Sequence, residues 1–501
     1  MSAKITINPV LCAACGTAVA FYCLHPLLYN GLIRSETLLV ILFIPIVPLS
    51  LFRVLASFPL SDKKQPPARL IRLVSVRIAA FAAGLALGIG AGVRSVPITH
   101  FGIPEDTITG ISGIVLDDPR PVSGDRAMAV VSLRMVMGQG GVRATAAGDI
   151  TVFFREENVD RLREFGRGTE VFADGNLRAG TGAYTFSAES LHVTASASPL
   201  DRFRTGLRLG LTQRFFRGDG QWGGLSLALL LGIRDNLDTT LAQQYREAGC
   251  SYILALSGMH LAVLIAIISF LLKKPLGLRA AALTGAGIII VYCFIVGPLP
   301  SLIRAALMYL LGVVAVLGMF KRDVLSLLCM AFLIQLAVTP LAGHSISFIL
   351  SYLALAGIII IGGMIGNVFK GMVPPVFLQP LAASLGAFIA TAGVMAFFFN
   401  DLRPIGIIAG LILAPLTMVF MVGSMLWLVL DLIHPLVSSL MGYPMSLLYW
   451  LMEKTASLAS YVPGIQANPF AVLPLSLALV GLLVWLDYRC RAAASRLEPF
   501  A

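Results

Sequence analysis

The chain is poor in charged residues. Only 13% of its 501 residues are charged, against about 25% in an ordinary soluble protein, and 57% are hydrophobic. This balance argues against a soluble enzyme or a soluble binding protein. Many apolar stretches approach or exceed the ~20 residues that a helix needs to cross a bilayer. We therefore predict a polytopic α-helical membrane protein with about 10–12 membrane helices and an inserted all-β domain.

Motifs for hydrolysis are also missing. The histidines are scattered and form no H-x-H-x-D-H ligand set, so a zinc nuclease site is not expected. No Walker motif is present, so ATP hydrolysis is not expected either. We predict no catalytic residue, no metal and no cofactor. The histidines are His25, His100, His192, His260, His344 and His434.

Cysteine is absent from residues 98–199, which therefore have no internal disulfide. Cys12 and Cys15 form a C-x-x-C within an apolar stretch, but no second cysteine pair accompanies them. Buried thiols are a better interpretation than a metal or redox site. The other cysteines lie in or beside apolar runs or just after the last one: Cys23, Cys250, Cys293, Cys329 and Cys490.

Residues 98–199 form the one large break in the hydrophobicity. Short β-like runs alternate there with Gly, Pro and Asp turns, which is typical of a small barrel or sandwich. A five-stranded OB-like barrel fits the length, with a short helical piece near 158–165. The runs are 107–115, 128–136, 149–154, 170–172, 184–186 and 191–194.

The predicted domains are N-terminal membrane helices (1–97), the β domain (98–199), an Arg-rich amphipathic helix (200–222) and a membrane core (223–501). The β domain has nine Arg, no Lys and thirteen acidic residues, a net charge of −4. Since the whole chain has a net charge of +11, the residues outside the β domain have a net charge of +15. Most of this positive charge lies in short links between apolar segments, which the positive-inside rule places in the cytoplasm. Three spans, about 10–33 (a retained helix), 36–57 and 72–94, then put the N-terminus in the cytoplasm. The β domain would lie outside the plasma (inner) membrane.

The Arg-rich helix has two interpretations. Phe203, Leu207, Leu211 and Phe215 recur every fourth residue along one slightly drifting stripe. The helix could lie in the membrane interface with its arginines on lipid headgroups. Alternatively, some arginines could meet a polyanionic substrate at a pore entrance. The candidate entrance residues are Arg202, Arg204, Arg208 and Arg214.

The second half contains further apolar segments. The first is too short to span and could be re-entrant. The segment 436–461 contains Glu453 and Lys454 and could lie in the interface, which leaves the loop parity after 432 open. The segments are 225–233, 251–272, 280–297, 301–320, 323–340, 346–367, 376–399, 404–432, 436–461 and 470–488.

Polar residues interrupt this half at helix-breaking sites, and broken helices at membrane depth usually line protein or a watery cavity. The segment Gly249–His260 places Ser257, Gly258 and His260 at the start of a span. Arg304 follows Gly297-Pro298-Leu299-Pro300-Ser301, and could either face a pore or extend to the headgroups. Ser257 and His260 could cap a helix, line a pore or form a Ser–His pair, although no acid is there to orient the imidazole.

Several of these pieces together resemble the ComEC/Rec2 competence family, the inner-membrane channel for incoming transforming DNA. They occur in the family's order and cover nearly the whole chain, with the β domain similar to that family's external OB-like domain. They are Leu229–Gly232, Tyr245–Gly249, Leu254–His260, Pro300–Met308, Ser347–Ala354 and Pro404–Pro415.

The resemblance departs from the family pattern in two places. Tyr252 stands where the family usually has a first histidine, which puts a role for paired histidines in doubt. Many members continue into a metallo-β-lactamase-like nuclease domain, whereas this chain ends shortly after its last apolar run. We therefore expect a separately encoded nuclease.

The resemblance implies a channel for single-stranded DNA, held among membrane lipids and served by a separate DNA receptor and a helicase or translocase. It also allows a homodimer. Because the β domain is acidic overall, we expect it to guide or dock partners and to bind DNA only weakly. A transporter of a small or lipid-linked anionic solute is the main alternative, followed by an intramembrane enzyme. The candidate DNA-path residues are Ser257, Gly258, His260, Arg304, Ser347, Ser351, Tyr352, Asn400 and Asp401.

Overall fold

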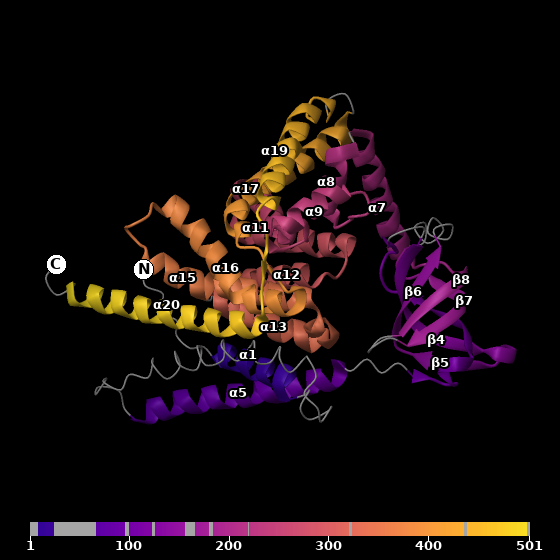
Figure 1. The fold of residues 1–501 in the computed structure, drawn as a ribbon, viewed down its shortest axis with the longest axis horizontal. Helices are drawn as coiled ribbons and strands as arrows, with labels where there is room; N and C mark the ends of the chain where they lie inside the picture. Colours follow the sequence, from indigo (N-terminus) through magenta and orange to yellow (C-terminus); the bar gives the residue numbers. More distant parts are fainter. Residues whose placement is uncertain are drawn as a thin grey trace.

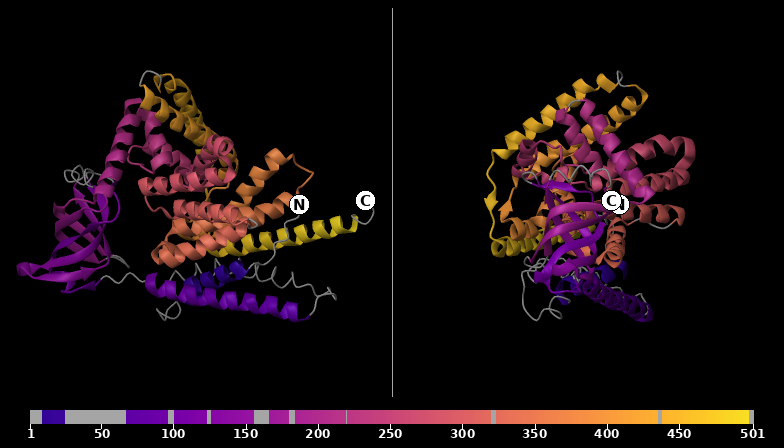
Figure 2. Two further views of the ribbon diagram at one scale, coloured as in Figure 1. Left: turned by 180° about the vertical axis from the view of Figure 1, so that it is seen from behind. Right: turned by 90° about the vertical axis from the view of Figure 1, so that its right-hand side faces the viewer.

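The protein consists of a helical body with a β-barrel standing to one side, joined by α7 (Pro199–Gly218) (Figures 1 and 2). The computed structural model describes residues 9–24, 67–95, 100–122, 126–155, 166–179, 184–218, 220–319, 323–434 and 438–497. The predicted span 36–57 and the helical piece near 158–165 lie outside the described residues.

The β domain is closed by hydrogen bonding around a ring of five strands. The ring runs β4–β2–β7–β8–β6, and β6 pairs back to β4. The β6–β8 pair is parallel and the others are antiparallel, which fits the predicted OB-like barrel. The ring strands are β2 (Ile108–Val115), β4 (Arg126–Gly138), β6 (Asp149–Arg155), β7 (Glu170–Ala179) and β8 (Tyr184–Ala195); β1 (His100–Phe101), β3 (Arg120–Val122) and β5 (Arg143–Ala147) pair at their margins.

Buried and half-buried side chains alternate along the strands, and the buried ones form the barrel core. In β6, Ile150, Val152 and Phe154 are buried, while Thr151 and Phe153 alternate with them and are only half-buried. The two runs 184–186 and 191–194 belong to one strand, β8. A register shift opposite Asp174 and Gly175 lets this strand continue past the irregularity.

The N-terminal helices form a closely packed pair beneath the body in Figure 1. α1 (Pro9–Val19) continues into a π-helical turn, η1 (Ala20–Leu24), and packs along α5 (Pro67–Ser95). A side chain on Gly84 or Gly88 would collide with the α1 backbone, so these glycines allow the close approach. Thr17 donates its hydroxyl to the Gly84 carbonyl at 3.0 Å.

Seven helical segments in the described residues are long and apolar enough to cross a membrane, which makes this a polytopic membrane protein. They are Gly258–Pro275, Gly277–Val296, Pro300–Leu317, Ile346–Val368, Pro375–Phe399, Ile405–Ile433 and Pro469–Arg489. The first two form α11, and the others are α12, α14 through α15, α16, α17 and the main part of α20 (Pro469–Leu497).

Shorter helices complete the body. α13 (Val324–Val338) has 15 residues, fewer than the predicted span 323–340, because the chain turns into a 3₁₀ segment at Pro340. α8 (Gly220–Leu231) is also short, as expected. The segment predicted to be interfacial contains α19 (Gly442–Ser460), which packs against α17 and α9 (Thr239–Glu247).

The predicted span 251–272 is wrong at its start. A short helix, α10 (Ser251–Leu254), ends there, and Ala255 and Ser257 take extended backbone conformations. The spanning helix α11 (Gly258–Val296) therefore begins at Gly258. It turns sharply at Gly277, whose φ of 76° is accessible to glycine at little cost.

The four residues of the predicted drifting stripe on the Arg-rich helix meet different surroundings at its two ends. Phe203 is 67% exposed whereas Phe215 is buried in the helical body. A four-residue spacing drifts around a helix of 3.6 residues per turn, so the first and last members face different surroundings. The helix ends at Gly218, short of the predicted 222, and α8 follows it.

Candidate functional site

Breaks in three helical segments meet in the centre of the body. They are the end of α8 at Leu231, the link 255–257 between α10 and α11, and the link 297–299 before α12 (Pro300–Leu317). Side chains satisfy the carbonyl groups freed at these breaks, as broken helices in membranes require. Tyr292 donates to the Leu230 carbonyl at 2.7 Å, and Ser301 donates to the Leu256 carbonyl at 2.6 Å.

Ser257 and His260 form a capping box at the start of α11. The Ser257 hydroxyl accepts from the Met259 backbone N–H at 3.3 Å, and the Ser257 backbone N–H donates to His260 Nδ1 at 3.1 Å. This assigns capping to Ser257, but His260 is buried at 1% exposure and does not lie at a surface. Because Nδ1 accepts, the neutral ring carries its proton on Nε2, which is buried without a hydrogen-bond partner.

Arg304 enters the site from the second turn of α12. It is 7% exposed, its Nη1 donates to the Ser351 carbonyl at 2.7 Å, and its guanidinium lies 5.9 Å from the centre of the Tyr352 ring. A Cβ on Gly258 would lie 3.0 Å from Arg304 Nη2, so glycine leaves room for the guanidinium. Within the described residues no carboxylate pairs with Arg304, and its Nε has no hydrogen-bond partner.

The sequence did not predict that Gln335 has a role in this site. Its buried side-chain amide forms hydrogen bonds with two neighbours of Arg304. Gln335, on α13, accepts from the Tyr352 hydroxyl at 2.9 Å and donates to the Pro300 carbonyl at 3.1 Å. It therefore ties the Tyr352 ring to the first residue of α12, four residues before Arg304. The sequence feature that could have indicated this role is the single amide side chain late in the largely apolar run of α13.

The remaining candidates are placed differently. Ser351 contributes its backbone carbonyl, and Ser347 is exposed on α14 (Ile346–Gly357). Asn400 ends α16 (Pro375–Phe399) in a left-handed conformation, with φ of 51°. Asp401 lies on β9 (Asp401–Leu402), which pairs with β10 (Ile465–Gln466), and its carboxylate accepts from Arg403 at 2.8 Å.

Arg403 connects Asn400 and Asp401 to the start of the segment Gly249–His260. Its Nη1 donates to the Glu247 carbonyl at 2.7 Å, at the end of α9. Gly249 packs against Arg403 and Gly406, and its φ of 69° suits glycine. The Asn400–Asp401 corner thus supports Gly249, while Arg304 contacts the other end of the segment at Gly258.

Two of the candidate entrance arginines are held at the junction between barrel and body. Arg204 Nη1 and Nη2 donate to the Asp118 carboxylate at 3.1 and 3.0 Å, and Arg208 Nε lies 3.3 Å from it. Both arginines also donate to the last carbonyls of α11, at Phe294, Ile295 and Val296. They neutralise the negative end of that helix, which is favourable there. We call this group of Asp118, Arg204 and Arg208 the junction clamp.

The other two arginines of α7 differ. Arg214 pairs with Asp431 on α17 at 2.9 Å, whereas Arg202, in the first turn, is exposed. Arg204 is 4% exposed, because its guanidinium is enclosed by Asp118 and the end of α11. Among the four, Arg202 is the arginine whose side chain has no hydrogen bond or ion pair within the described residues.

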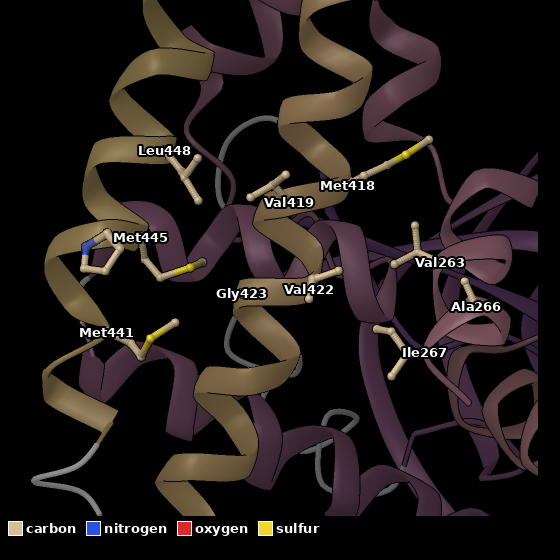
Figure 3. A pocket seen from close by; sticks show the side chains of 11 residues that line it. Val263, Ala266, Ile267, Met418, Val419, Val422, Gly423, Met441, Met445 and Leu448 are labelled. Atoms are coloured by element: carbon tan, nitrogen blue, oxygen red, sulfur yellow. The ribbon is translucent and has the colours of Figure 1, made fainter. Parts of the chain in front are cut away.

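A separate apolar cavity of about 570 Å³ lies between α11, α17 and α19 (Figure 3). Its wall includes Val263, Val422, Met418, Met441 and Met445. It presents no charged side chain, so it has no group that would recognise an anion. The described residues also contain no group of three His, Cys, Asp or Glu side chains that could hold a metal ion.

The site therefore combines buried cationic and N–H groups with broken helices. Buried donors without partners are unfavourable, and an anion would satisfy both Arg304 and the N-terminal end of α11.

Comparison with known proteins gives one finding on the same part of the chain. A family model described as Competence protein matches residues 229–489, from the end of α8 to the end of the last apolar span. No curated protein matches the chain.

Proposed function

The chain belongs to the competence protein family, which supports a role in DNA uptake, and on that basis we propose that its helical core carries single-stranded DNA across the plasma membrane. The observation that supports this most is the buried Arg304 guanidinium, which has no carboxylate partner within the described residues. A buried cation is costly unless an anion or several acceptors compensate it. A passing phosphate would supply that compensation for a short time.

The same arrangement suits a strand that must move. A channel must hold its cargo favourably enough to admit it and weakly enough to release it. Arg304 already has one acceptor, the Ser351 carbonyl, and its buried Nε has no hydrogen-bond partner, so a phosphate oxygen that entered the site would meet an unpaired donor. His260 Nε2 offers a second N–H donor on the neighbouring helix. The energy for movement would come from a separate translocase or from a gradient.

We propose that the N-terminus lies in the cytoplasm and the barrel outside the plasma membrane. The basic residues in the short links between spans support this orientation by the positive-inside rule. A separate DNA receptor would deliver the strand at the barrel side, and a separate nuclease would degrade its complement. A homodimer is compatible with this arrangement.

Import is tested with labelled double-stranded DNA in cells with and without the gene. We expect DNA to reach the cell surface in both strains, but to reach the cytoplasm only when the gene is present. Unchanged import in a strain that transforms would contradict the proposal. A transporter of a small or lipid-linked anion would then become the first explanation of Arg304.

Substitution of Ser257 separates capping from catalysis. Ser257→Ala removes the cap and is expected to cost about 1 kcal/mol of stability. Ser257→Asn keeps a neutral side-chain acceptor for the Met259 N–H and is expected to restore both stability and import. A nucleophilic serine would not tolerate this change. Loss of import in a well-folded Ser257→Asn protein would therefore favour the intramembrane enzyme.

A further inference from the structure

The apolar cavity between α11, α17 and α19 is lined in part by two of the membrane-spanning segments (Figure 3). They are Gly258–Pro275 of α11 and Ile405–Ile433 of α17. Three wall residues on α17 are exposed, Met418, Val419 and Val422, so the cavity opens on the outer surface of the helical body. In a membrane, that surface faces lipid tails. An acyl chain therefore matches the chemistry of this cavity, whose wall has no charged side chain.

The face of α11 that lines the cavity also carries positive charge. Ala266 and Ile267 belong to the wall, and Lys273 and Lys274 each follow one of them by seven residues. Seven residues make two helical turns, so both lysines lie on the same face, about 10 Å farther along the helix. Phe270 lies between them on this face, and it is exposed like the two lysines. Apolar wall and ammonium groups thus follow each other in the order of a lipid tail and its headgroup.

No carboxylate of the described residues pairs with these two lysines. Residues 248–322, which include all of α11, contain no Asp or Glu. Each of the other two cavity-lining helices has one acid. Asp431 on α17 pairs with an arginine of α7 at 2.9 Å, and Glu453 on α19 lies 3.9 Å from the neighbouring lysine. Neither lysine of α11 has an ion pair or a side-chain hydrogen bond within the described ranges. A phosphate is therefore the complementary partner for this end of the face.

We propose that the cavity and the two lysines bind one anionic phospholipid, with an acyl chain between α11, α17 and α19 and its phosphate on Lys273 and Lys274. Met441 and Met445 in the wall are unbranched and flexible, so the wall adapts to a chain while the lysines select the headgroup. Basic groups beside spans on the cytoplasmic side suit the anionic lipids of that leaflet, which agrees with the proposed orientation. This lipid site goes beyond DNA uptake and does not depend on it.

The headgroup is tested by native mass spectrometry of the full chain in detergent, titrated with dioleoyl phosphatidylglycerol or dioleoyl phosphatidylcholine. Each lysine contributes about a fivefold preference for an anionic headgroup, so we expect the wild type to prefer phosphatidylglycerol by about 25-fold. Lys273→Gln/Lys274→Gln should bind the two lipids equally. Arg143→Gln/Lys370→Gln is the matched control, because it removes the same charge from exposed positions on other elements and should keep the preference.

The acyl chain is tested with Ala266→Phe, which fills the cavity from an exposed position of its wall. We expect this variant to lose the specific site for both lipids. Ala478→Phe adds the same side chain to an exposed position of α20 and should bind like the wild type.

Three results would overturn the lipid site. The wild type could bind both lipids equally, the double lysine variant could keep its preference, or Ala266→Phe could bind lipid normally. If Ala266→Phe bound lipid normally but turned a dimer into monomers, the cavity would be an interface between two copies of the chain. DNA import is measured separately in cells, so the lipid site and the proposed function fail independently.

Discussion

Replacing Arg304 with Gln is expected to lower DNA import by about 10- to 100-fold while the protein still folds into the membrane. A hydrogen bond to a charged group is worth about 1.5–3 kcal/mol, which corresponds to roughly this range. Gln can still donate a hydrogen bond toward Ser351, but it cannot compensate a phosphate charge. Import of labelled DNA is measured at matched protein levels.

Two further variants make the Arg304 result specific. Arg304→Lys retains the charge but loses the planar guanidinium, so we expect import between those of the wild type and Arg304→Gln. Arg279→Gln removes an exposed arginine from α11 and should import normally. Normal import by Arg304→Gln would show that this cation has a structural role and does not contact the strand.

Asp118→Asn is expected to lower stability by about 3 kcal/mol and to loosen the barrel from the body. One carboxylate compensates both Arg204 and Arg208, so its loss leaves two largely buried cations with only the carbonyls of α11. Thermal unfolding of the purified protein measures the stability. Limited proteolysis near the start of α7 measures the loosening.

Glu170→Gln provides the matched control for the junction clamp. It removes a carboxylate from the same barrel, but the pair with Arg134 is exposed and should contribute less than about 1 kcal/mol. Equal stability of the Asp118 and Glu170 variants would show that the junction clamp does not hold the barrel. A destabilised Asp118 variant that resists proteolysis at α7 would contradict the predicted loosening.

Much of the architecture follows from the sequence alone because it depends on local patterns. Apolar length predicts the spans, and alternation with turn residues predicts the barrel strands. Helix breaks are predictable where glycine or proline marks them, as at Gly297-Pro298. The order of motifs through the core likewise indicates the family, which the match over residues 229–489 shows.

Only the tertiary structure decides which side chains meet. The sequence places Arg304 near the start of a span, but Ser351 and Gln335 reach it or its neighbours from other helices. The spacing in α7 leaves both an interfacial helix and a pore entrance open, whereas the fold directs Arg204 and Arg208 to Asp118, 86 residues before Arg204. Pattern rules concern neighbours along the chain, but ion pairs and binding faces depend on distances in space, which folding alone sets.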